Sequence, residues 1–516
     1  MQVRKFSRGV SSQNYILPSP VGGLNVRDSL DMMKETDAIV MDNYFPGDTR
    51  VSLRRGYVKY VDFAGTVKTL AEYKSPNGNR LLAFGDGKMR DISSSKGEIV
   101  YERGYRSDKW QTAMFKNRLF LLNGVDAPQV FYENNGEMCL EIARFSGDNL
   151  EVNKLINLCA SKQRLFMVEK GTLNAWYSEQ AGEVQGNLLK FDLSAVVRDG
   201  GELQAIACWT LDGGQGLEDL TVFITSEGEA AVYSGTDPND ADNWSLKGVY
   251  RLSRPIGYRC TLQYQGDEVL ICEDGYIPLS KALPLDKAGI SQIAFSDKIR
   301  GLVLERTRLN RMKDGWQGII YSRGGYALFN VPAAQQFEQH VINLNTGAWC
   351  RFTNIRAHCW GLFNGRLYFG SDNGVFLFDE GYADNKTHIM GHIEQAYTNL
   401  GCNNLKKIQL INPRTTSSTK YALVVYTNTD FNSQEQKYAE NIGNVGITKW
   451  SRAKWSSKQN PIGTKWATLK GKIRSQWIAN SATGFKASLV FKTKTRGNLI
   501  EWYDTGFRYE QGCGIL

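Results

Sequence analysis

Few residues of this 516-residue chain have the types and spacing that would support metal or acid–base chemistry. Among its four histidines, His388 and His392 lie four positions apart, as they would on a zinc-binding helix. The segment between them contains Gly391, and no glutamate adjoins either histidine, so a metalloprotease motif is absent. We therefore expect no metal at these histidines.

Three other short motifs match a chemistry only in part. Asp237, Asp240 and Asp242 resemble a sparse calcium loop without its glycine and terminal glutamate, so we expect them to cap backbone groups in turns. Residues 213–216 are glycine-rich but lack the Lys-Ser/Thr ending of a phosphate-binding loop. Residues 371–374 resemble part of the sialidase Asp-box, with a different spacing and no closing Trp. We predict no catalytic residue, cofactor or metal, although carboxylates paired across strands would be invisible in the sequence.

The nine cysteines do not have the pattern of a disulfide framework or a zinc cluster. Their number is odd, and no CxxC pair occurs. Most stand in apolar, strand-like contexts, so we expect them to be small core residues. They are Cys139, Cys159, Cys208, Cys260, Cys272, Cys350, Cys359, Cys402 and Cys513.

Positive charge is concentrated at the C-terminal end. Residues 401–516 contain 18 Lys and Arg against 6 Asp and Glu, whereas residues 1–400 contain 44 against 47. A basic region suggests contact with an acidic surface or a polyanion, with a solvated basic face as the alternative. The possible DNA or partner contacts are Lys449, Arg452, Lys454, Lys458, Lys492, Lys494 and Arg496.

Two tryptophans, Trp450 and Trp455, stand among the first four of these basic residues. Alternating aromatic and basic side chains can stack the bases of a single strand. Packed duplex DNA offers few such bases, so for residues 448–458 we favour a subunit contact or a surface loop.

The elements that would position these residues are strands. Seven segments consist of a strand, a turn containing Gly or Asn, and a second strand, which is the pattern of a β-hairpin. Anchor positions at 80, 118, 164, 221, 268, 317 and 366 place the hairpins 38 to 57 residues apart. One four-stranded blade takes roughly 40–50 residues, and a ring of blades is a β-propeller. The sequence therefore predicts a mainly β protein with a propeller of about six to seven blades; the alternative is an irregular β-sandwich.

The hairpin period ends near residue 395, where the charge balance also changes. We predict an extended N-terminal arm at 1–60, a β-propeller at 61–395 and a basic, β-sandwich-like C-terminal domain at 396–516. Within the arm, residues 29–43 combine an N-cap candidate with apolar residues, which favours a helix. A pattern with one apolar and one charged side at 290–310 predicts a helical insertion between blades.

The composition, 42% hydrophobic and 22% charged, is that of a folded protein. No apolar run approaches the roughly 20 residues that span a bilayer. The first 15 residues contain no apolar segment of the kind found in a signal peptide. We therefore expect the protein to be made in a cytoplasm.

Several blocks of sequence resemble a single family. They are PSPVGGLNVRDSL, AIVMDNYFP and LRRGY within 18–57, YSGTDPNDADNWSLKGVYRLSRPIGYRC at 233–260, DEVLICEDGYIPLSKAL at 267–283 and GHIEQAYTNLGCNNLKKIQLINP at 391–413. This chain resembles the tail nozzle proteins of short-tailed bacteriophages (podoviruses), also called packaged-DNA stabilisation or tail hub proteins. The blocks are scattered over most of the chain and identify no catalytic residue.

The resemblance implies a structural virion protein located in the tail. A propeller-containing subunit usually forms a homohexameric ring below the portal and its adaptor protein. The ring surrounds the channel for double-stranded DNA, retains the packaged DNA, and allows its ejection when the tail engages the host cell envelope. Tail fibre or spike proteins attach nearby. The basic segment 401–516 departs from the simplest version of the family and could contact DNA or an acidic neighbour.

Two other functions remain open. A glycan-binding or glycan-cleaving propeller predicts a central pocket with clustered Arg and acidic side chains, and activity as a monomer. A ring-forming virion subunit instead predicts assembly without turnover. A cytoplasmic scaffold of the WD40 type is a weaker alternative, because the GH and WD dipeptides do not recur at the blade period.

Overall fold

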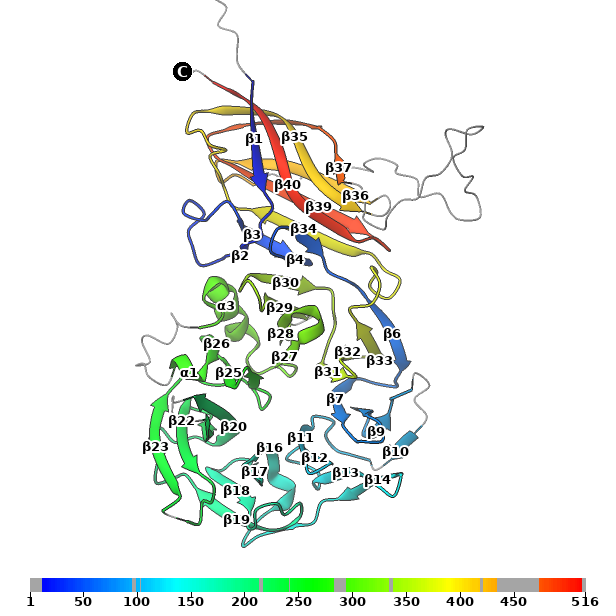
Figure 1. Ribbon diagram of the computed structural model, residues 1–516, viewed down its shortest axis with the longest axis vertical. Coiled ribbons are helices and arrows are strands. Elements are labelled where there is room, and N and C mark those ends of the chain that lie inside the picture. The colour runs from blue at the N-terminus through cyan, green and yellow to red at the C-terminus, as the bar shows by residue number, and fades with distance from the viewer. Residues whose placement is uncertain are drawn as a thin grey trace, which may run out of the picture. The chain divides into compact units, whose positions relative to one another are not determined.

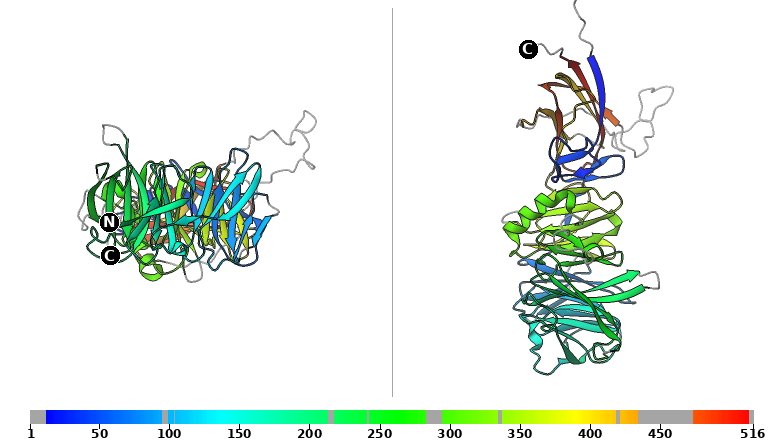
Figure 2. Two further views of the ribbon diagram at one scale, coloured as in Figure 1. Left: turned by 90° about the horizontal axis from the view of Figure 1, so that it is seen from below. Right: turned by 90° about the vertical axis from the view of Figure 1, so that its left-hand side faces the viewer.

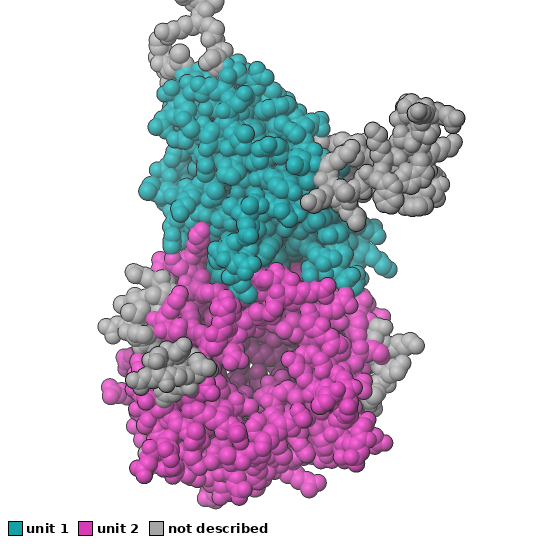
Figure 3. Space-filling view, in the orientation of Figure 1, with its two compact units in different colours: residues 1–58, 341–352, 379–516 teal, residues 59–340, 353–378 magenta. Residues whose placement is uncertain are grey.

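The structure is a computed structural model that describes residues 12–94, 99–102, 104–212, 217–240, 242–282, 294–333, 337–417, 421–433 and 473–512. The chain divides into two compact units, shown in Figure 3. Unit 1 comprises residues 1–58, 341–352 and 379–516, and unit 2 comprises residues 59–340 and 353–378. Among the described residues, no helix is both long and apolar enough to cross a membrane.

Unit 2 is a β-propeller, in which antiparallel sheets surround a common axis (Figure 1). Figure 2 shows its strands running across the thickness of the ring. The first two blades are β7 (Val67–Tyr73), β8 (Arg80–Gly85), β9 (Lys88–Asp91) and β10 (Ile99–Glu102), then β11 (Gln111–Phe115), β12 (Arg118–Leu122), β13 (Gln129–Asn134) and β14 (Glu137–Ile142). The next two are β16 (Leu155–Ser161), β17 (Arg164–Glu169), β18 (Asn174–Ser178) and β19 (Gly186–Asp192), then β20 (Leu203–Asp212), β21 (Leu217–Thr225), β22 (Glu229–Gly235) and β23 (Trp244–Arg251).

The later blades are less regular. One has three described strands, β24 (Thr261–Tyr264), β25 (Asp267–Cys272) and β26 (Gly275–Pro278). A further group is β27 (Gln317–Tyr321), β28 (Tyr326–Val331) and the start of β29 (Glu338–Asn343). The last blade is β31 (Cys359–Phe363), β32 (Arg366–Ser371), β33 (Gly374–Phe378) and β6 (Tyr57–Asp62). With six separate sheets and the β27–β29 group, the predicted propeller is confirmed.

The ring is closed by strands from distant parts of the sequence. Strand β6, which precedes the first blade along the chain, completes the sheet of β31, β32 and β33. Gly374, at the start of β33, has a φ of 152°, and a Cβ there would lie 2.6 Å from the Val61 carbonyl oxygen. Only glycine fits this close approach, because a side chain would force the closing strand away.

Each core of unit 2 lies between neighbouring blades. Phe166, Phe223, Tyr233 and Trp244 form one such cluster, in which the Tyr233 and Trp244 rings stack with centroids 5.3 Å apart. Another, containing Val67, joins the first blade to the last. These apolar contacts on both faces of the blades hold the ring together.

Helix α3 (Arg300–Asn310) follows the short 3-10 turn η2 (Asp297–Ile299). It buries Val303 and Thr307, and the Thr307 hydroxyl donates to the Glu273 carbonyl oxygen at 2.9 Å. The predicted helical insertion is thus confirmed over 300–310, and residues 290–293 lie outside the described part. Other short helical turns are η1 (Val152–Lys154), α1 (Leu279–Ala282) and η3 (Ser322–Gly324).

Unit 1 is a β-sandwich of two sheets. One contains β1 (Ser12–Pro18), β4 (Tyr44–Pro46), β5 (Val51–Leu53), β35 (Lys406–Ser417), β37 (Ile473–Ser475), β38 (Ile478–Gly484) and β40 (Ile500–Gln511). The other contains β2 (Gly23–Leu24), β3 (Asp37–Asp42), β30 (Trp349–Thr353), β34 (Ile389–Gln395), β36 (Ala422–Thr429) and β39 (Ala487–Thr495). The rings of Phe491 and Trp502, one from each sheet, stack 4.6 Å apart in the core.

The predicted helix at residues 29–43 is wrong, because Asp37–Asp42 form β3. This strand pairs antiparallel with β34, where Ala38 lies opposite Gln395. Ile39 and Val40 are β-branched and favour strands, and pairing with β30 and β34 on either side overrides the local helical pattern. The predicted division into arm, propeller and C-terminal domain stays a prediction; in the structure, residues 12–58 share unit 1 with the C-terminal region.

Candidate functional site: an axial cavity and a basic strand

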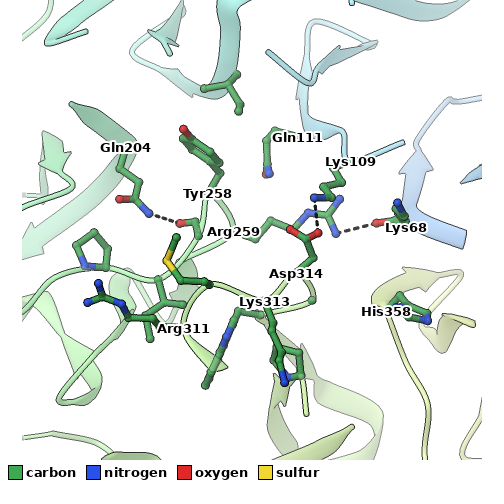
Figure 4. Close-up of a pocket in the computed structure, with 18 of the residues that line it drawn as sticks. Lys68, Lys109, Gln111, Gln204, Tyr258, Arg259, Arg311, Lys313, Asp314 and His358 are labelled. Carbon is green, nitrogen blue, oxygen red and sulfur yellow. Dashed lines mark hydrogen bonds and ion pairs between the residues drawn. The ribbon is translucent and has the colours of Figure 1, made fainter. Parts of the chain in front are cut away.

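A cavity in unit 2 has a volume of about 940 Å³. Figure 3 shows the hollow in this face of unit 2, and Figure 4 shows part of the lining. That volume falls within the range of roughly 300–1,000 Å³ in which small-molecule sites are found. Its walls come from nearly every blade, so the ring as a whole builds the site.

The blade repeat explains why distant residues meet here. Most lining segments either lead into the first strand of a blade, as residues 107–109, 254–259 and 311–316 do, or form the turn between the second and third strands, as Glu227 and Glu273 do. In a propeller these two kinds of connection come to the same face of the ring. Side chains more than 200 positions apart therefore line one cavity.

The lining is basic, with eight Lys and Arg against four Asp and Glu. Three of the acidic groups are neutralised by lining cations: Glu227 by Arg254 at 2.5 Å, Glu273 by Arg311, and Asp314 by Lys109. The fourth, Glu202, accepts from the Gly171 amide at 2.8 Å and from the Tyr258 hydroxyl at 3.3 Å. Among the described residues, the following lining cations form no ion pair: Lys68, Lys170, Arg259 and Lys313.

Arg259 lies across the axis. Its guanidinium donates to the Lys68 carbonyl oxygen at 3.1 Å, to the Thr69 hydroxyl at 2.6 Å and to the Trp110 carbonyl oxygen at 2.8 Å. It thus joins the segment before β24 to the first two blades (Figure 4). Burial lowers the pKa of this guanidinium. Arg259 also lines a second cavity of about 200 Å³, so it stands between two spaces on the axis.

One histidine lies at the rim of the large cavity. His358 Nε2 is 2.8 Å from Asp372 Oδ1, and Arg356 Nε donates to the other oxygen of the same carboxylate at 2.7 Å. A carboxylate that orients a histidine is a common arrangement in acid–base chemistry. Here the carboxylate is shared with an arginine, so it also serves to hold Arg356 at the rim.

Two thiols meet on the innermost strands of adjacent blades. Cys159 Sγ of β16 and Cys208 Sγ of β20 are 2.6 Å apart. The hydrogen bond between them lowers the pKa of the Cys208 thiol. Glu268 of β25 interacts electrostatically with both thiols, and burial raises its pKa to about 8.

The cysteine predictions hold in part. Cys260, Cys272, Cys350 and Cys359 are buried, as expected for small core residues. Cys139, Cys159, Cys208 and Cys402 are half-buried, and Cys513 lies outside the described residues.

The sequence-predicted contact residues divide into two groups. Lys449, Arg452, Lys454 and Lys458 lie outside the described residues. In unit 1, Lys492 and Lys494 lie on β39, two positions apart and hence on one face of the sheet, and Arg496 follows the strand. Lys492 is half-buried, with Nζ 5.9 Å from the centre of the Tyr426 ring, whereas Lys494 and Arg496 are exposed.

We call Lys492, Lys494 and Arg496 the basic strip. The neighbouring strand β34 places a histidine beside it. His392 of β34 lies opposite Lys492, and burial and the lysine lower the pKa of this imidazole. His388 precedes β34 on the chain. In the described part of the chain, no three His, Cys, Asp or Glu side chains form a group that could hold a metal ion.

The predicted capping role of the acidic loop is confirmed for Asp237 and Asp240, and it stays a prediction for Asp242. Asp237 accepts from the Asn239 amide at 3.0 Å, and Asp240 accepts from the Asp242 amide at 3.1 Å. Asp237 also pairs with the buried Arg164 at 2.6 Å. These carboxylates cap turns and hold the loop to β17.

The cavity residues were not predicted as a site. Arg259 lies within the segment 233–260, one of the blocks that carry the family resemblance. Residues 254–258 of the lining lie in the same block, and Glu273 lies in the block 267–283, whereas the remaining lining residues are scattered over the blades and follow no local motif.

Comparison with known proteins gives no family. No protein-family model and no curated protein sequence matches the chain. The solved structures similar to it include BBS1N from a complex with ARL6DN (9% identity, 64% of this chain and 99% of that chain, TM-score 0.36). They also include the extracellular domain of a hybrid two component system from B. thetaiotaomicron (12% identity, 74% of this chain and 52% of that chain, TM-score 0.38). Raptor from Chaetomium thermophilum is similar over 64% of this chain and 29% of that chain (10% identity, TM-score 0.39).

Proposed function

We propose that this chain is a structural subunit of a short phage tail. It forms a nozzle or hub ring below the portal and its adaptor, retains packaged DNA and guides it during ejection. The observation that carries the proposal is the surface of unit 1, which has the properties of an assembly unit. The resemblance of residues 18–57 and 391–413 to tail nozzle proteins supports the same function, because both blocks fold into this unit.

Exposed apolar side chains are concentrated on unit 1. It carries ten of the fourteen large hydrophobic residues exposed among the described residues, although unit 2 is the larger unit. Where exposed apolar groups form a contiguous patch, they mark a surface that binds other proteins. The ten are Ile16, Val26, Leu30, Met32, Val58, Met390, Phe431, Ile473, Trp477 and Phe485.

Two of these residues share one sheet face. Ile16 of β1 lies directly opposite Gly506 of β40, and residues opposite each other in an antiparallel pair point to the same face. A Cβ on Gly506 would lie 3.6 Å from the ring of Trp477, which is 46% exposed. The missing side chain at Gly506 thus leaves Ile16 and Trp477 as an apolar pair open to a neighbouring subunit.

The basic strip supports a role beside DNA. Duplex DNA carries one negative charge per roughly 1.7 Å of axis, so cations on a channel wall attract it without reading bases. Lys492 and Lys494 on β39, and Arg496 directly after this strand, would provide such contacts. A conduit needs this diffuse attraction, since base-specific binding would stop the DNA from passing.

The first test is assembly. The purified full chain is weighed by light scattering and imaged in negative stain, alone and with portal–adaptor complexes of short-tailed phages. We expect a ring of about six copies, either free or formed on the adaptor. A stable monomer that does not bind any adaptor would contradict the proposal.

The second test concerns DNA. Replacing Lys492, Lys494 and Arg496 by Ser should weaken duplex binding and reduce its salt dependence by a log–log slope of about 2 to 3. The same experiment with Lys449, Arg452 and Lys454 tests the other predicted group. The exposed Lys74, Lys116 and Lys190 of unit 2, replaced by Ser, provide the matched control. Unchanged binding across a salt series would count against a DNA-facing strip.

A second candidate function is a glycan-binding or glycan-cleaving propeller. One observation favours it: the axial cavity contains the clustered Arg and acidic side chains that such a protein requires. Binding on a glycan array, or turnover by a monomeric chain in a hydrolase screen, would support this function over the ring subunit.

A further inference from the structure

We propose that the axial cavity of unit 2 is a binding site for a compact anion that carries phosphate, with pyrophosphate as its probe. This inference concerns the propeller alone and does not depend on ring assembly. It starts from the unequal numbers of cations and anions that line the cavity.

The charge excess of the lining favours an anionic ligand. Eight Lys and Arg face four Asp and Glu; Asp372, which pairs with Arg356, and Asp108, which interacts electrostatically with Lys68, reduce the excess of positive charges to two. A phosphate group carries about −1.5 to −2 charges at neutral pH. An anion with one or two phosphate groups therefore carries enough negative charge to balance this excess.

The arrangement of the pairs favours an external anion. Arg254, Lys109 and Arg311 are already held by lining carboxylates, so they shape the wall and add little net charge. Arg259 and Lys68 lie together on one side, since the Arg259 guanidinium donates to the Lys68 carbonyl oxygen. Figure 4 shows both beside the open space of the cavity, with Lys313 on another part of its wall. A ligand between them would contact cations from several blades.

The types of cation favour phosphate. Three of the four cations without an ion pair are lysines, Lys68, Lys170 and Lys313, whose ammonium groups are compact point charges on flexible stems. Lysines of this kind bind phosphate oxygens without the planar geometry that arginine imposes on carboxylates. Arg259 is partly buried and already bonded to three oxygens, so it contributes a fixed charge at the bottom of the site.

A neutral sugar fits the lining less well. Sugar sites present aromatic faces for stacking, but Trp316 and Phe337 are buried at 4% and 8% exposure. Tyr258 is the partly exposed aromatic residue of the described lining, and its hydroxyl already bonds to Glu202. Charge therefore dominates recognition in this cavity.

The probe is inorganic pyrophosphate, titrated into the full chain by calorimetry at low ionic strength. We expect one site in the propeller, with binding weakened about tenfold in Lys68→Ser and in Lys313→Ser, and about a hundredfold in the double variant. Both lysines are exposed, and the Lys68 carbonyl that holds Arg259 is unchanged by the substitution, so the fold should be preserved. The double variant Lys74→Ser/Lys190→Ser removes two exposed lysines outside the cavity and should bind as the wild type does.

A second readout tests the position of the anion. Pyrophosphate should protect Lys68 and Lys313 from acetylation, measured by mass spectrometry, while Lys74 and Lys190 stay reactive. No binding of pyrophosphate at millimolar concentration, or an equal loss in the control double variant, would overturn the proposal. Saturable binding of a neutral oligosaccharide that displaces pyrophosphate would also overturn it in favour of a sugar site.

Discussion

Unit 2 and unit 1 are both built of strands, but the strands that pair with each other are close in sequence in unit 2 and far apart in unit 1. Most blades of unit 2 consist of strands that follow one another, so hairpins bring them together. In unit 1, β40 pairs with β1, almost 500 residues away, and β3 pairs with β34. Among the described strands of unit 2, β6, the closing strand, has a comparable long-range pairing.

The difference shows where each unit obtains its stability. In unit 2, local hairpins lose little entropy when their short loops close, and the apolar clusters between blades supply the further stabilisation. Unit 1 must hold three chain segments together, and it uses buried polar contacts to do so. Gln395 of β34 donates to the Pro18 and Glu35 carbonyl oxygens at 2.7 and 2.6 Å, joining the C-terminal and N-terminal segments.

The largest effect should come from breaking a buried ion pair of unit 1. Arg54 bonds both oxygens of Asp384 at 2.8 and 2.6 Å, and the two side chains are 1% and 3% exposed. Arg54→Ala leaves a buried carboxylate without its partner, which costs about 3–5 kcal/mol. We expect hydrogen exchange in β3, β34 and β40 to rise while the blades of unit 2 stay protected.

The control for this prediction is the exposed pair Arg27–Asp28, also in unit 1. Arg27→Ala should change the stability of unit 1 by less than about 1 kcal/mol. An equal rise of exchange in both units would show that they unfold together and would remove the contrast between them.

The second effect is a pH dependence expected in unit 2. Burial raises the pKa of Glu268 from 4.5 to about 8, so the folded state holds this proton more tightly than the unfolded state does. Stability should therefore fall as the pH rises from about 4.5 to 8, by about 2–4 kcal/mol. Glu268→Gln removes the penalty, and its melting temperature should exceed that of the wild type increasingly from pH 5 to pH 9.

Glu137→Gln, at an exposed position of β14, is the matched control and should follow the wild type at every pH. If Glu268→Gln and the wild type lose stability in parallel as the pH rises, Glu268 is not the group responsible.

A smaller effect should follow from removing the axial contact in unit 2. Arg259→Ala deletes the hydrogen bonds to the first two blades and should cost about 1.5–3 kcal/mol. Hydrogen exchange should rise in β7 and β11 without a change in unit 1. The exposed Arg251, paired with Asp199, gives the control Arg251→Ala. Equal exchange in the two variants would mean that apolar contacts alone hold the blades in place.

The smallest effect concerns the two thiols of unit 2. Glutathione disulfide should oxidise Cys159 and Cys208 to an interblade disulfide: two thiols give up two protons and two electrons, and the oxidant becomes two glutathione molecules. Mass spectrometry should show a loss of two hydrogens and one cross-linked peptide pair, absent in Cys159→Ser. Cross-links that involve Cys402 of unit 1 instead would show that thiol exposure, not proximity, decides the reaction.

The period of the hairpins was sufficient to predict the propeller, because each hairpin is local and its turn has its own sequence signal. Asp86 and Gly87, for example, adopt φ values of 54° and 68° between β8 and β9, which an Asp-Gly turn favours. The anchor at 317 is an exception, since it marks the first strand of its blade and not the second. The error at residues 29–43 has the opposite cause. Strand β3 forms there by pairing with β34, and local sequence gives no sign of this pairing because β34 lies 350 residues away.

Local patterns in the chain were enough to predict the strand-rich class, the propeller, the basic C-terminal region and the capping role of Asp237 and Asp240. These follow from local composition and turn chemistry, which act over a few residues. Three features emerged from the folded chain alone. The N-terminal strands join the C-terminal sheets, β6 closes the ring, and Lys68, Arg259 and Lys313 line one cavity. Each of these depends on contacts between residues far apart in the chain, and no local pattern encodes which distant partner a strand or a charge will meet.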